Sequence, residues 1–451
     1  MSRPSVRSIV HTRMLRTALL SLALTGACRS AQHGAAREST PASRILSDIA
    51  YLADDRLEGR GTGTAGNDSA ATWLARRHAS LGLRAVVMDT SSAACRARPG
   101  PAGCGTFLQR FTARGVELAH AGKPEGVATQ NVVALVPGRD PALSGEYVVI
   151  GAHFDHLGRS PANSLDPEER DAIRNGADDN ASGTAALLEL AKQLAAQPAR
   201  RSVLFVHFSG EELGLLGSQW FVEHSPVALD SVSAMVNFDM IGRLRGDRLI
   251  VYGTGTATEL PALLDNANVA PRLRLSTVPD GFGPSDHASF YAKGVPVLHF
   301  FTDLHDDYHK ATDDTWKINA PGEARVVALA ERVVRAIADR PARLSPVKVA
   351  AAPSMAPKRE GSAVYLGTIP DMGSSDVPGL KLTGVRAGSP ADKGGLASGD
   401  VIVELGGKPV KDLYTYSDAL YAHQPGDVVE IGYLRNGARH SATVTLGTRS
   451  Q

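Results

Sequence analysis

From residue 131 onward, short apolar runs alternate with segments in which apolar residues recur every three or four positions. The short runs are dense in Val, Ile and Phe, which is typical of strands buried on both faces of a sheet. They read NVVALVPG, EYVVIGAH, SVLFVHFSG, SAMVNFDMIG, RLIVYGTG and VPVLHFF. Helical periodicity appears near 183–196, 213–224, 258–269 and 286–293, and a last helix reads EARVVALAERVVRAIADR. The alternation predicts an α/β fold, a mostly parallel sheet sandwiched by helices, with sites beyond the carboxyl ends of the strands.

Residues 42–84 show two amphipathic helical patterns around the loop LEGRGTGTAGND. Gly61, Gly63 and Gly66 give this loop the spacing G-x-G-x-x-G. A dinucleotide-binding loop of that spacing follows a strand, whereas a charged segment of helical periodicity precedes this one. We therefore interpret the loop as a glycine-rich turn.

The C-terminal part of the chain has a different pattern. Four prolines and no regular alternation mark 341–360 as a linker. Residues 361–448 are rich in β-forming runs and contain Asn436-Gly437, a dipeptide typical of a two-residue hairpin turn. The sequence thus predicts a large α/β domain over 42–340 and a small β-rich domain over 361–448.

The N-terminus has the pattern of a secretory signal peptide over 1–27. Residues 1–16 are Arg-rich without an acidic residue, and TALLSLALTGA is apolar but too short to span a bilayer. The stretch LTGAC resembles a bacterial lipoprotein signal, in which Cys28 is lipidated and attaches the protein to a membrane. Cleavage by an ordinary signal peptidase is the alternative. Both predict an exported protein: a periplasmic or outer-membrane lipoprotein, or an extracellular protein.

Charge and cysteine content narrow the picture further. Lys plus Arg number 48 and Asp plus Glu 47, and no basic run occurs, so nucleic acid is not expected as a partner. Cys95 and Cys104 remain after Cys28, and no CxxC motif accompanies them. In an exported chain, such a pair predicts a disulfide that closes a small surface loop.

Acidic residues and histidines stand where the predicted strands end. They are His153 and Asp155, Glu211 and Glu212, Asp239, and His309, and Asp178 and Asp179 lie in the turn NGADDNASG before a predicted helix. Parallel strands end at one edge of a sheet, so these side chains are expected to converge. Clustered carboxylates repel one another unless a cation neutralises them. Two His with several carboxylates suit zinc, and a shared carboxylate can hold two ions about 3.5–4 Å apart, so we predict two Zn²⁺ ions.

Five segments carry a resemblance to a known family: GAHFDHLG, NGADDNASG, SGEELGLLGS, NFDMIG and YHKATDD. In order and spacing they resemble the motifs of co-catalytic zinc aminopeptidases of the secreted bacterial leucyl-aminopeptidase type, related to glutamate carboxypeptidases and glutaminyl cyclases. The resemblance covers about 42–340. It implies that His153 and either Glu212 or Asp239 are terminal ligands on opposite ions, that His309 completes the second site, and that Asp179 bridges the ions.

The same resemblance implies roles around the metals. Glu211 is the general base, and Asp155 orients the ring of His153. Tyr308 matches a position at which some relatives place a hydroxyl that steadies the developing oxyanion. Asp286 and His287, in SDHASF, are expected to line the pocket.

Three other histidines receive structural interpretations. His207 and His299 lie inside predicted strands and are interpreted as packed strand residues. His156, next to Asp155, is also interpreted as structural.

The implied activity is that of an exopeptidase acting on peptides, in the first place a metallo-aminopeptidase. Glu211 would activate a metal-bridging water and return its proton to the leaving amine. The alternatives are a carboxypeptidase, a dipeptidase or a glutaminyl cyclase on the same scaffold. A fourth alternative is an inert peptidase fold that serves as a peptide-binding scaffold.

The C-terminal domain resembles a bacterial PDZ domain through YLGTIPD, GSPADKGGLASGDVIVELGGKPV and DLYTYSDALYA. The resemblance implies a groove that takes a peptide C-terminus by strand addition. The loop at Tyr365, Leu366 and Gly367 would present backbone N–H groups to the carboxylate. A substrate, a protein partner and the chain's own catalytic domain are the alternatives for its ligand.

Overall fold

The computed structural model describes most of the chain. The described residues are 39–89, 95, 104–115, 118, 122–160, 164–166, 168–349, 364–370, 379–385, 388–411 and 413–448. The predicted signal peptide over 1–27 and Cys28 lie outside them, as do residues 350–360 of the predicted linker and 361–363 of the predicted small domain. Among the helices that the structure describes, none has both the length and the apolar character needed to cross a bilayer.

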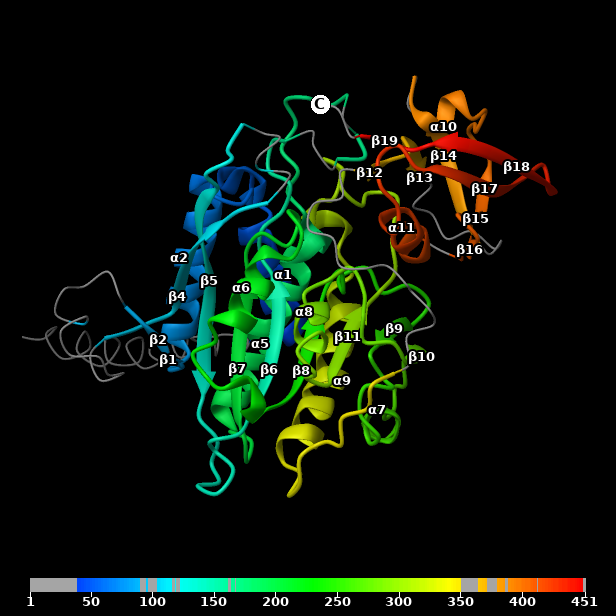
Figure 1. Ribbon diagram of the computed structural model, residues 1–451. Helices are drawn as coiled ribbons and strands as arrows, with labels where there is room; N and C mark the ends of the chain where they lie inside the picture. The colour runs from blue at the N-terminus through cyan, green and yellow to red at the C-terminus, as the bar shows by residue number, and fades with distance from the viewer. Residues whose placement is uncertain are drawn as a thin grey trace, which may run out of the picture. The chain divides into compact units, whose positions relative to one another are not determined.

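A nine-stranded sheet organises the first domain, with strand order β1-β5-β7-β6-β8-β11-β9-β10 and β4 also paired to β5 (Figure 1). The strands are β1 (Arg84–Ala85), β4 (Leu108–Ala113), β5 (Val127–Val136), β6 (Tyr147–His153), β7 (Ser202–Phe208), β8 (Val232–Phe238), β9 (Arg248–Tyr252), β10 (Arg274–Val278) and β11 (Val297–Phe301). Every residue of β7, β8 and β11 is buried, which explains their unbroken apolar runs.

The expected α/β class is confirmed, and the sheet is mixed. The central strands β7, β6, β8 and β11 are parallel neighbours. Toward the edges, β5 runs antiparallel to β7, and β9 runs antiparallel to β11. An apolar run reads the same in either direction, so the pattern of residues could not reveal these reversals.

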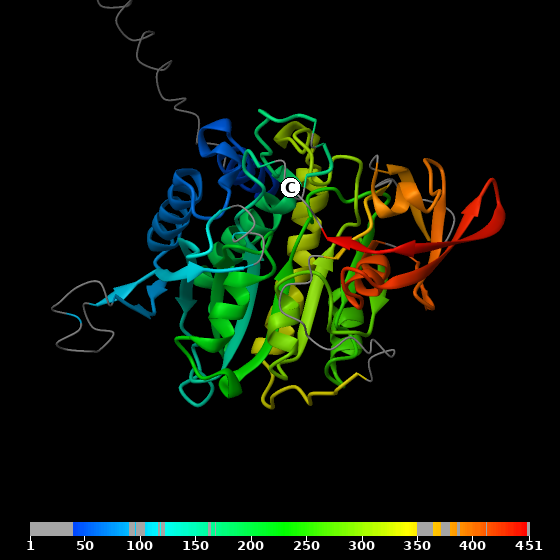
Figure 2. The same cartoon turned by 45° about the horizontal axis from the view of Figure 1, so that its top comes forward.

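Helices cover both faces of the sheet (Figure 2). One core cluster holds buried residues of α1 (Pro41–Leu52), α2 (Ala65–Ser80), α5 (Gly183–Ala196), α7 (Leu260–Ala267) and α9 (Ala320–Ala338). A second cluster holds residues of α6 (Leu216–Glu223) and α8 (His287–Tyr291). Caps mark several helix starts: Thr64 accepts a hydrogen bond from Asn67 N at α2, and Asn319 accepts one from Gly322 N at α9.

The stretch LEGRGTGTAGND connects α1 to α2, and its last residues form the first turn of α2. A 3₁₀ helix, η1 (Asp55–Arg60), separates α1 from α2, and no strand leads into the loop. Gly66 is required by close packing, because a Cβ there would lie 1.8 Å from the carbonyl oxygen of Leu57.

The predicted disulfide is present between Cys95 and Cys104, with an S–S distance of 2.09 Å. A short ladder of β2 (Val87–Met88) and β3 (Gly105–Thr106) lies beside it, and Asp89 N donates to Cys104 O.

The described residues of the second domain form a six-stranded sheet, a separate two-stranded sheet and a core of their own. Its elements are β12 (Val364–Tyr365), β13 (Thr368–Pro370), β14 (Leu380–Val385), α10 (Pro390–Lys393), β15 (Val401–Leu405), β16 (Lys408–Pro409), α11 (Leu413–Tyr421), β17 (Val428–Arg435), β18 (Ala438–Thr445) and β19 (Gly447–Thr448). The hairpin β17–β18 turns at Asn436 and Gly437, whose φ angles are 51° and 79°. Positive φ at both turn residues is the geometry that Asn-Gly favours.

Candidate metal centre

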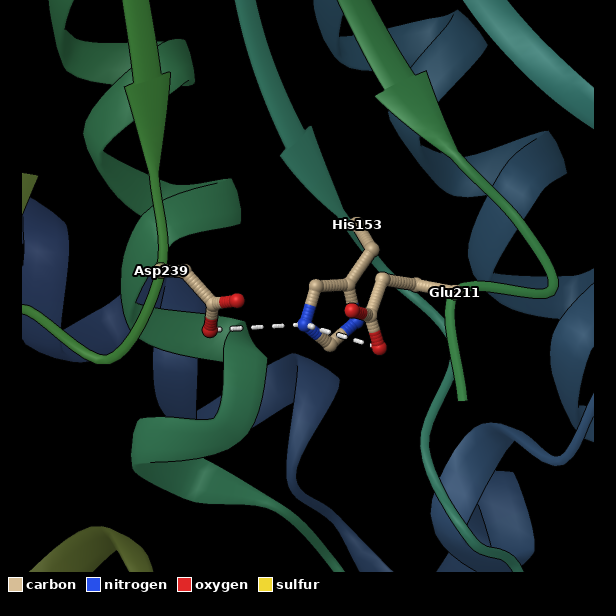
Figure 3. A group of neighbouring side chains, drawn as sticks. All are labelled: His153, Glu211 and Asp239. Carbon is tan, nitrogen blue, oxygen red and sulfur yellow. Dashed lines mark ion pairs between the residues drawn. The ribbon is translucent and has the colours of Figure 1, made fainter. Parts of the chain in front are cut away.

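The residues predicted as ligands converge at the carboxyl ends of the central strands. His153 is the last residue of β6, Asp239 follows β8, and Glu211 and Glu212 lie in the loop after β7. Asp179 lies in η2 (Ala177–Ser182), directly before α5, and His309 lies in the loop after β11. Figure 3 shows His153, Glu211 and Asp239 pointing toward one another from three separate elements.

Asp179 directs each of its carboxylate oxygens at a different histidine. Its Oδ1 lies 3.3 Å from His153 Nε2, and its Oδ2 lies 3.2 Å from His309 Nε2. Asp239 Oδ1 lies 3.4 Å from His153 Nε2, whereas Glu212 Oε2 lies 3.1 Å from His309 Nε2. Of the two alternatives for the terminal carboxylates, the geometry groups Asp239 with His153 and Glu212 with His309, and Asp179 lies between the two groups.

Glu211 lies beside the His153 group but farther from its ring. Its Oε2 is 4.0 Å from His153 Nε2. Burial, partly offset by His153, raises the pKa of Glu211 well above its usual value, and nearby Glu212 and Asp239 add to the effect. A carboxylate of raised pKa has a high affinity for a proton, which suits a general base.

Asp155 supports both His153 and the loop that carries Glu211. His153 Nδ1 is 3.1 Å from the main-chain carbonyl of Asp155 and 3.8 Å from its carboxylate. The carboxylate instead accepts hydrogen bonds from Thr62 Oγ1 at 2.8 Å and from Glu211 N at 3.3 Å. The closer partner of the ring is therefore the Asp155 carbonyl rather than its side chain.

The two aspartates of the turn NGADDNASG have different partners. Asp178 Oδ1 accepts from Gly242 N at 2.6 Å, and Asp178 Oδ2 lies 3.1 Å from His305 Nε2, away from the two groups. Asp313 Oδ2 accepts from the backbone N of both Asp178 and Asp179, at 2.9 and 3.0 Å. Sequence reasoning missed Asp313 and His305, although Asp313 stands in the quoted segment YHKATDD.

The charges of the centre fit divalent ions. Burial alone lowers the pKa of His153, but Asp239 and Glu211 outweigh it and raise that pKa well above its usual value. The pKa of His309 is raised in the same way by Glu212 and Asp179. The carboxylates thus favour positive charge at the centre, which a metal ion can supply in place of protons. Asp239 Oδ1, which has no hydrogen-bond partner among the described residues, offers a lone pair toward His153.

A small cavity of about 40 Å³ opens at the centre. Five of the acidic and histidine residues line it, together with Met240, Pro284, Phe301 and Tyr308. The ring of Tyr308 stacks on His309 at 3.9 Å, and burial together with the nearby carboxylates raises the pKa of Tyr308, so its hydroxyl stays protonated.

Asp286 and His287 do not line this cavity, contrary to expectation. Both side chains are fully buried. His287 stacks on His299 at 4.3 Å, so packing of the SDHASF segment takes these residues into the interior. His207 and His299 are buried within β7 and β11, as interpreted.

The comparisons with known proteins agree with the fold and the motifs. Residues 131–334 match Peptidase family M28, and residues 359–446 match the PDZ domain. Both matches agree with the resemblance of these two regions to a peptidase and to a PDZ domain.

Individual known proteins are similar to part of this chain. Leucine aminopeptidase 1 of Arthroderma otae is 33% identical over 207 residues, which cover 41% of this chain and 51% of that protein. A Zn-dependent exopeptidase from Parabacteroides distasonis is 15% identical, with a TM-score of 0.51 over 65% of this chain and 97% of its own. A zinc aminopeptidase from Bacillus subtilis is 17% identical, with a TM-score of 0.50 over 66% and 95%. At these identities the solved structures show the shared fold alone, and the chain spans about half the length of the curated relatives it matches.

Proposed function

We propose that this protein is a zinc-dependent aminopeptidase that removes N-terminal residues from peptides. The observation that supports it most is the position of Asp179, with one carboxylate oxygen toward His153 and the other toward His309. A carboxylate between two such groups is suited to hold two ions at once. Two zinc ions, when bound, would supply a nucleophilic water of lowered pKa and polarise the scissile carbonyl.

The choice of the peptide's amino end rests on the cavity wall. Its described lining residues include three carboxylates and no Lys or Arg. A carboxypeptidase needs such a cation to hold the C-terminal carboxylate of its substrate, so this lining suits a substrate bound by its amino end. The apolar members Met240, Pro284 and Phe301 suit an apolar side chain on the first residue of the substrate.

Three residues would carry the proton and charge movements. Glu211 takes a proton from the attacking water and later donates it to the leaving amine. Asp155 holds the His153 ring through its carbonyl and the Glu211 loop through its carboxylate. The protonated hydroxyl of Tyr308 is suited to donate to the oxyanion that forms on the substrate carbonyl.

Export, attachment and the PDZ groove complete the proposal. The signal peptide over 1–27 would direct the protein out of the cytoplasm, with Cys28 as the site of a lipid anchor. The PDZ domain would bind peptide C-termini or a protein partner at Tyr365, Leu366 and Gly367. Mass spectrometry of the mature N-terminus separates a lipidated Cys28 from a plain cleaved end.

The first prediction concerns activity and metal content. Purified protein should carry about two zinc ions per chain and hydrolyse leucine anilides and peptides with a free N-terminus, but not N-acetylated ones. Glu211→Gln should lower kcat by about 10²–10⁴-fold, because the amide takes up no proton. Glu223→Gln, at an exposed position of α6, is the matched control and should leave kcat unchanged.

Two results would contradict the proposal: full activity of Glu211→Gln, or cleavage that depends on a free C-terminus. The second would identify a carboxypeptidase. Cyclisation of N-terminal glutamine without hydrolysis would identify a cyclase on the same scaffold.

A further inference from the structure

His156 contacts Glu212 through Oε1, the carboxylate oxygen that does not face His309. Its Nδ1 is 2.6 Å from Glu212 Oε1 and 3.8 Å from Asp179 Oδ2, and the residue is 2% exposed. A carboxylate oxygen only accepts hydrogen bonds, so Nδ1 carries the proton and donates it. Glu212 Oε2 lies on the other side, 3.1 Å from His309 Nε2. One oxygen of Glu212 is therefore held by His156 while the other is turned toward His309.

The contact with Glu212 is made by one particular atom of the ring. His156 Nε2 is buried and has no hydrogen-bond partner among the described residues. The ring of His156 meets the ring of His309 edge-on, at 5.7 Å between centroids. Nδ1 is therefore the atom through which His156 acts on the centre, and a substitution that keeps a donor there is distinguishable from one that does not.

The turn NGADDNASG, which carries Asp179, packs closely around the ring of His156. Gly176, just before η2, packs directly against it: a Cβ at Gly176 would lie 2.5 Å from ring atoms of His156. Gly61 forms an isolated parallel bridge with His156, and His156 N donates to Arg60 O at 3.4 Å. The loop LEGRGT and the turn NGADDNASG thus enclose His156 from two sides.

Arg60 ties these two sides together. Its guanidinium group is fully buried and donates to main-chain carbonyls of Phe154 at 2.7 Å, Asn175 at 2.6 Å and Gly176 at 3.0 Å. Phe154 is next to His153, and Gly176 begins the turn that carries Asp179. Hydrogen bonds from Arg60 therefore connect the backbone segments on both sides of His156. The ring has little freedom to move away from Glu212.

We propose that His156 is a positioning residue for one of the two metal sites. By donating from Nδ1 to Glu212 Oε1, it holds Glu212 in the orientation that presents Oε2 to the ion shared with His309 and Asp179. The ion held by His153 and Asp239 does not depend on it. The inference rests on the proposed function only in taking the centre to bind two zinc ions, and its test measures zinc binding rather than catalysis.

The proposal is tested by titrating the full chain with zinc. Calorimetry and competition with a chromogenic chelator measure the affinity of each binding step. His156→Leu should weaken one of two zinc-binding steps by about 10–100-fold, as loss of a residue that orients a ligand does, and leave the other step unchanged. His156→Asn, whose amide nitrogen takes the place of Nδ1, should restore most of the affinity. His156→Gln, whose amide falls near the place of Nε2, should not.

Double variants identify which zinc site is affected by the loss of His156. In Asp239→Asn, which impairs the first site, the remaining zinc step should weaken on adding His156→Leu. In His309→Asn, which impairs the second site, the remaining step should not respond. His78→Leu is the control for loss of a buried histidine, since His78 contacts His207 rather than the centre, and both zinc steps should persist.

Several results would overturn the inference: both steps unchanged in His156→Leu, both weakened equally, or Gln restoring affinity as well as Asn. If His156→Leu does not fold, the comparison of Asn with Gln still decides. Two zinc steps with the expected response but no aminopeptidase activity would contradict the proposed function and support the inference. Fewer than two zinc steps in the unaltered protein would contradict both.

Discussion

Adjacent residues in this centre have opposite electrostatic surroundings. Burial raises the pKa of Glu211 well above its usual value, and its neighbouring carboxylates add to the shift. Burial also acts on Glu212, but His309 and His156 outweigh it and lower the pKa of Glu212 to about 2. In the metal-free protein, Glu212 therefore stays ionised while Glu211 holds a proton more readily. Two glutamates in sequence are in this way suited to different tasks, a ligand and a base.

Asp313 holds the backbone of the turn NGADDNASG, which carries Asp179. Replacing it with Ala should destabilise the metal-free protein by about 2–4 kcal/mol, because two buried N–H groups, of Asp178 and Asp179, lose their acceptor. Urea unfolding in the presence of a chelator measures the loss. Asp265→Ala, at an exposed position of α7, should change stability by less than about 0.5 kcal/mol. Equal effects of the two substitutions would contradict the role given to Asp313.

At the scale of elements, a pair of buried histidines joins α2 to β7. His78 Nε2 and His207 Nε2 are 2.8 Å apart, and both side chains are fully buried. One ring donates and the other accepts, so a proton added to the accepting nitrogen breaks the contact. Burial lowers the pKa of His78 to about 3 and lowers the pKa of His207 as well.

This pair predicts a loss of stability in acid. In the unfolded chain, a His titrates near its usual pKa of about 6.5, whereas folded His78 resists protonation until about pH 3. The stability is present in full above pH about 6.5 and declines as the pH falls toward 3, since the unfolded state binds the extra proton. His78 alone should account for about 2 kcal/mol between pH 7.5 and 5.0.

Urea unfolding at the two pH values, with a chelator present, measures this loss. His78→Gln, which keeps polar atoms but does not titrate, should reduce the difference by about that amount. His440→Gln, at an exposed position of β18, should leave it unchanged. An identical pH dependence in the His78 variant and the unaltered protein would count against the buried pair as its source.

At the scale of the molecule, the buried apolar residues form separate cores. One cluster has all its members within 364–446, and the clusters around the nine-stranded sheet have theirs within 45–344. Each part therefore has the means to unfold on its own. The proposed zinc ligands all belong to the first part, so ion binding should stabilise that part alone.

Calorimetry of the full chain should then show two transitions. Zinc at about 1,000 times its dissociation constant should add about 4 kcal/mol to the first domain and nothing to the PDZ domain. Removing the metal should lower one transition temperature and leave the other in place. A single transition that moves as a whole on metal removal would show that the two parts unfold together.

Local features of the chain were predictable because they depend on neighbouring residues. Burial of β7 and β8 requires unbroken apolar runs, and the turn at Asn436 and Gly437 requires residues that tolerate positive φ. The order of acids and histidines along the chain, with the five motifs, was sufficient to predict the convergence at the strand ends. Each of these features depends on residues that are close together in the sequence.

The tertiary structure decided what depends on contacts between distant segments. Strand direction at the sheet edges, the grouping of Asp239 with His153 and of Glu212 with His309, and the support from Asp313 all depend on such contacts. The contact of His156 with Glu212 joins the loops after two different strands. A residue's type states which bonds it can make, but its partner is selected only when the packed backbone brings one atom within reach and excludes the others.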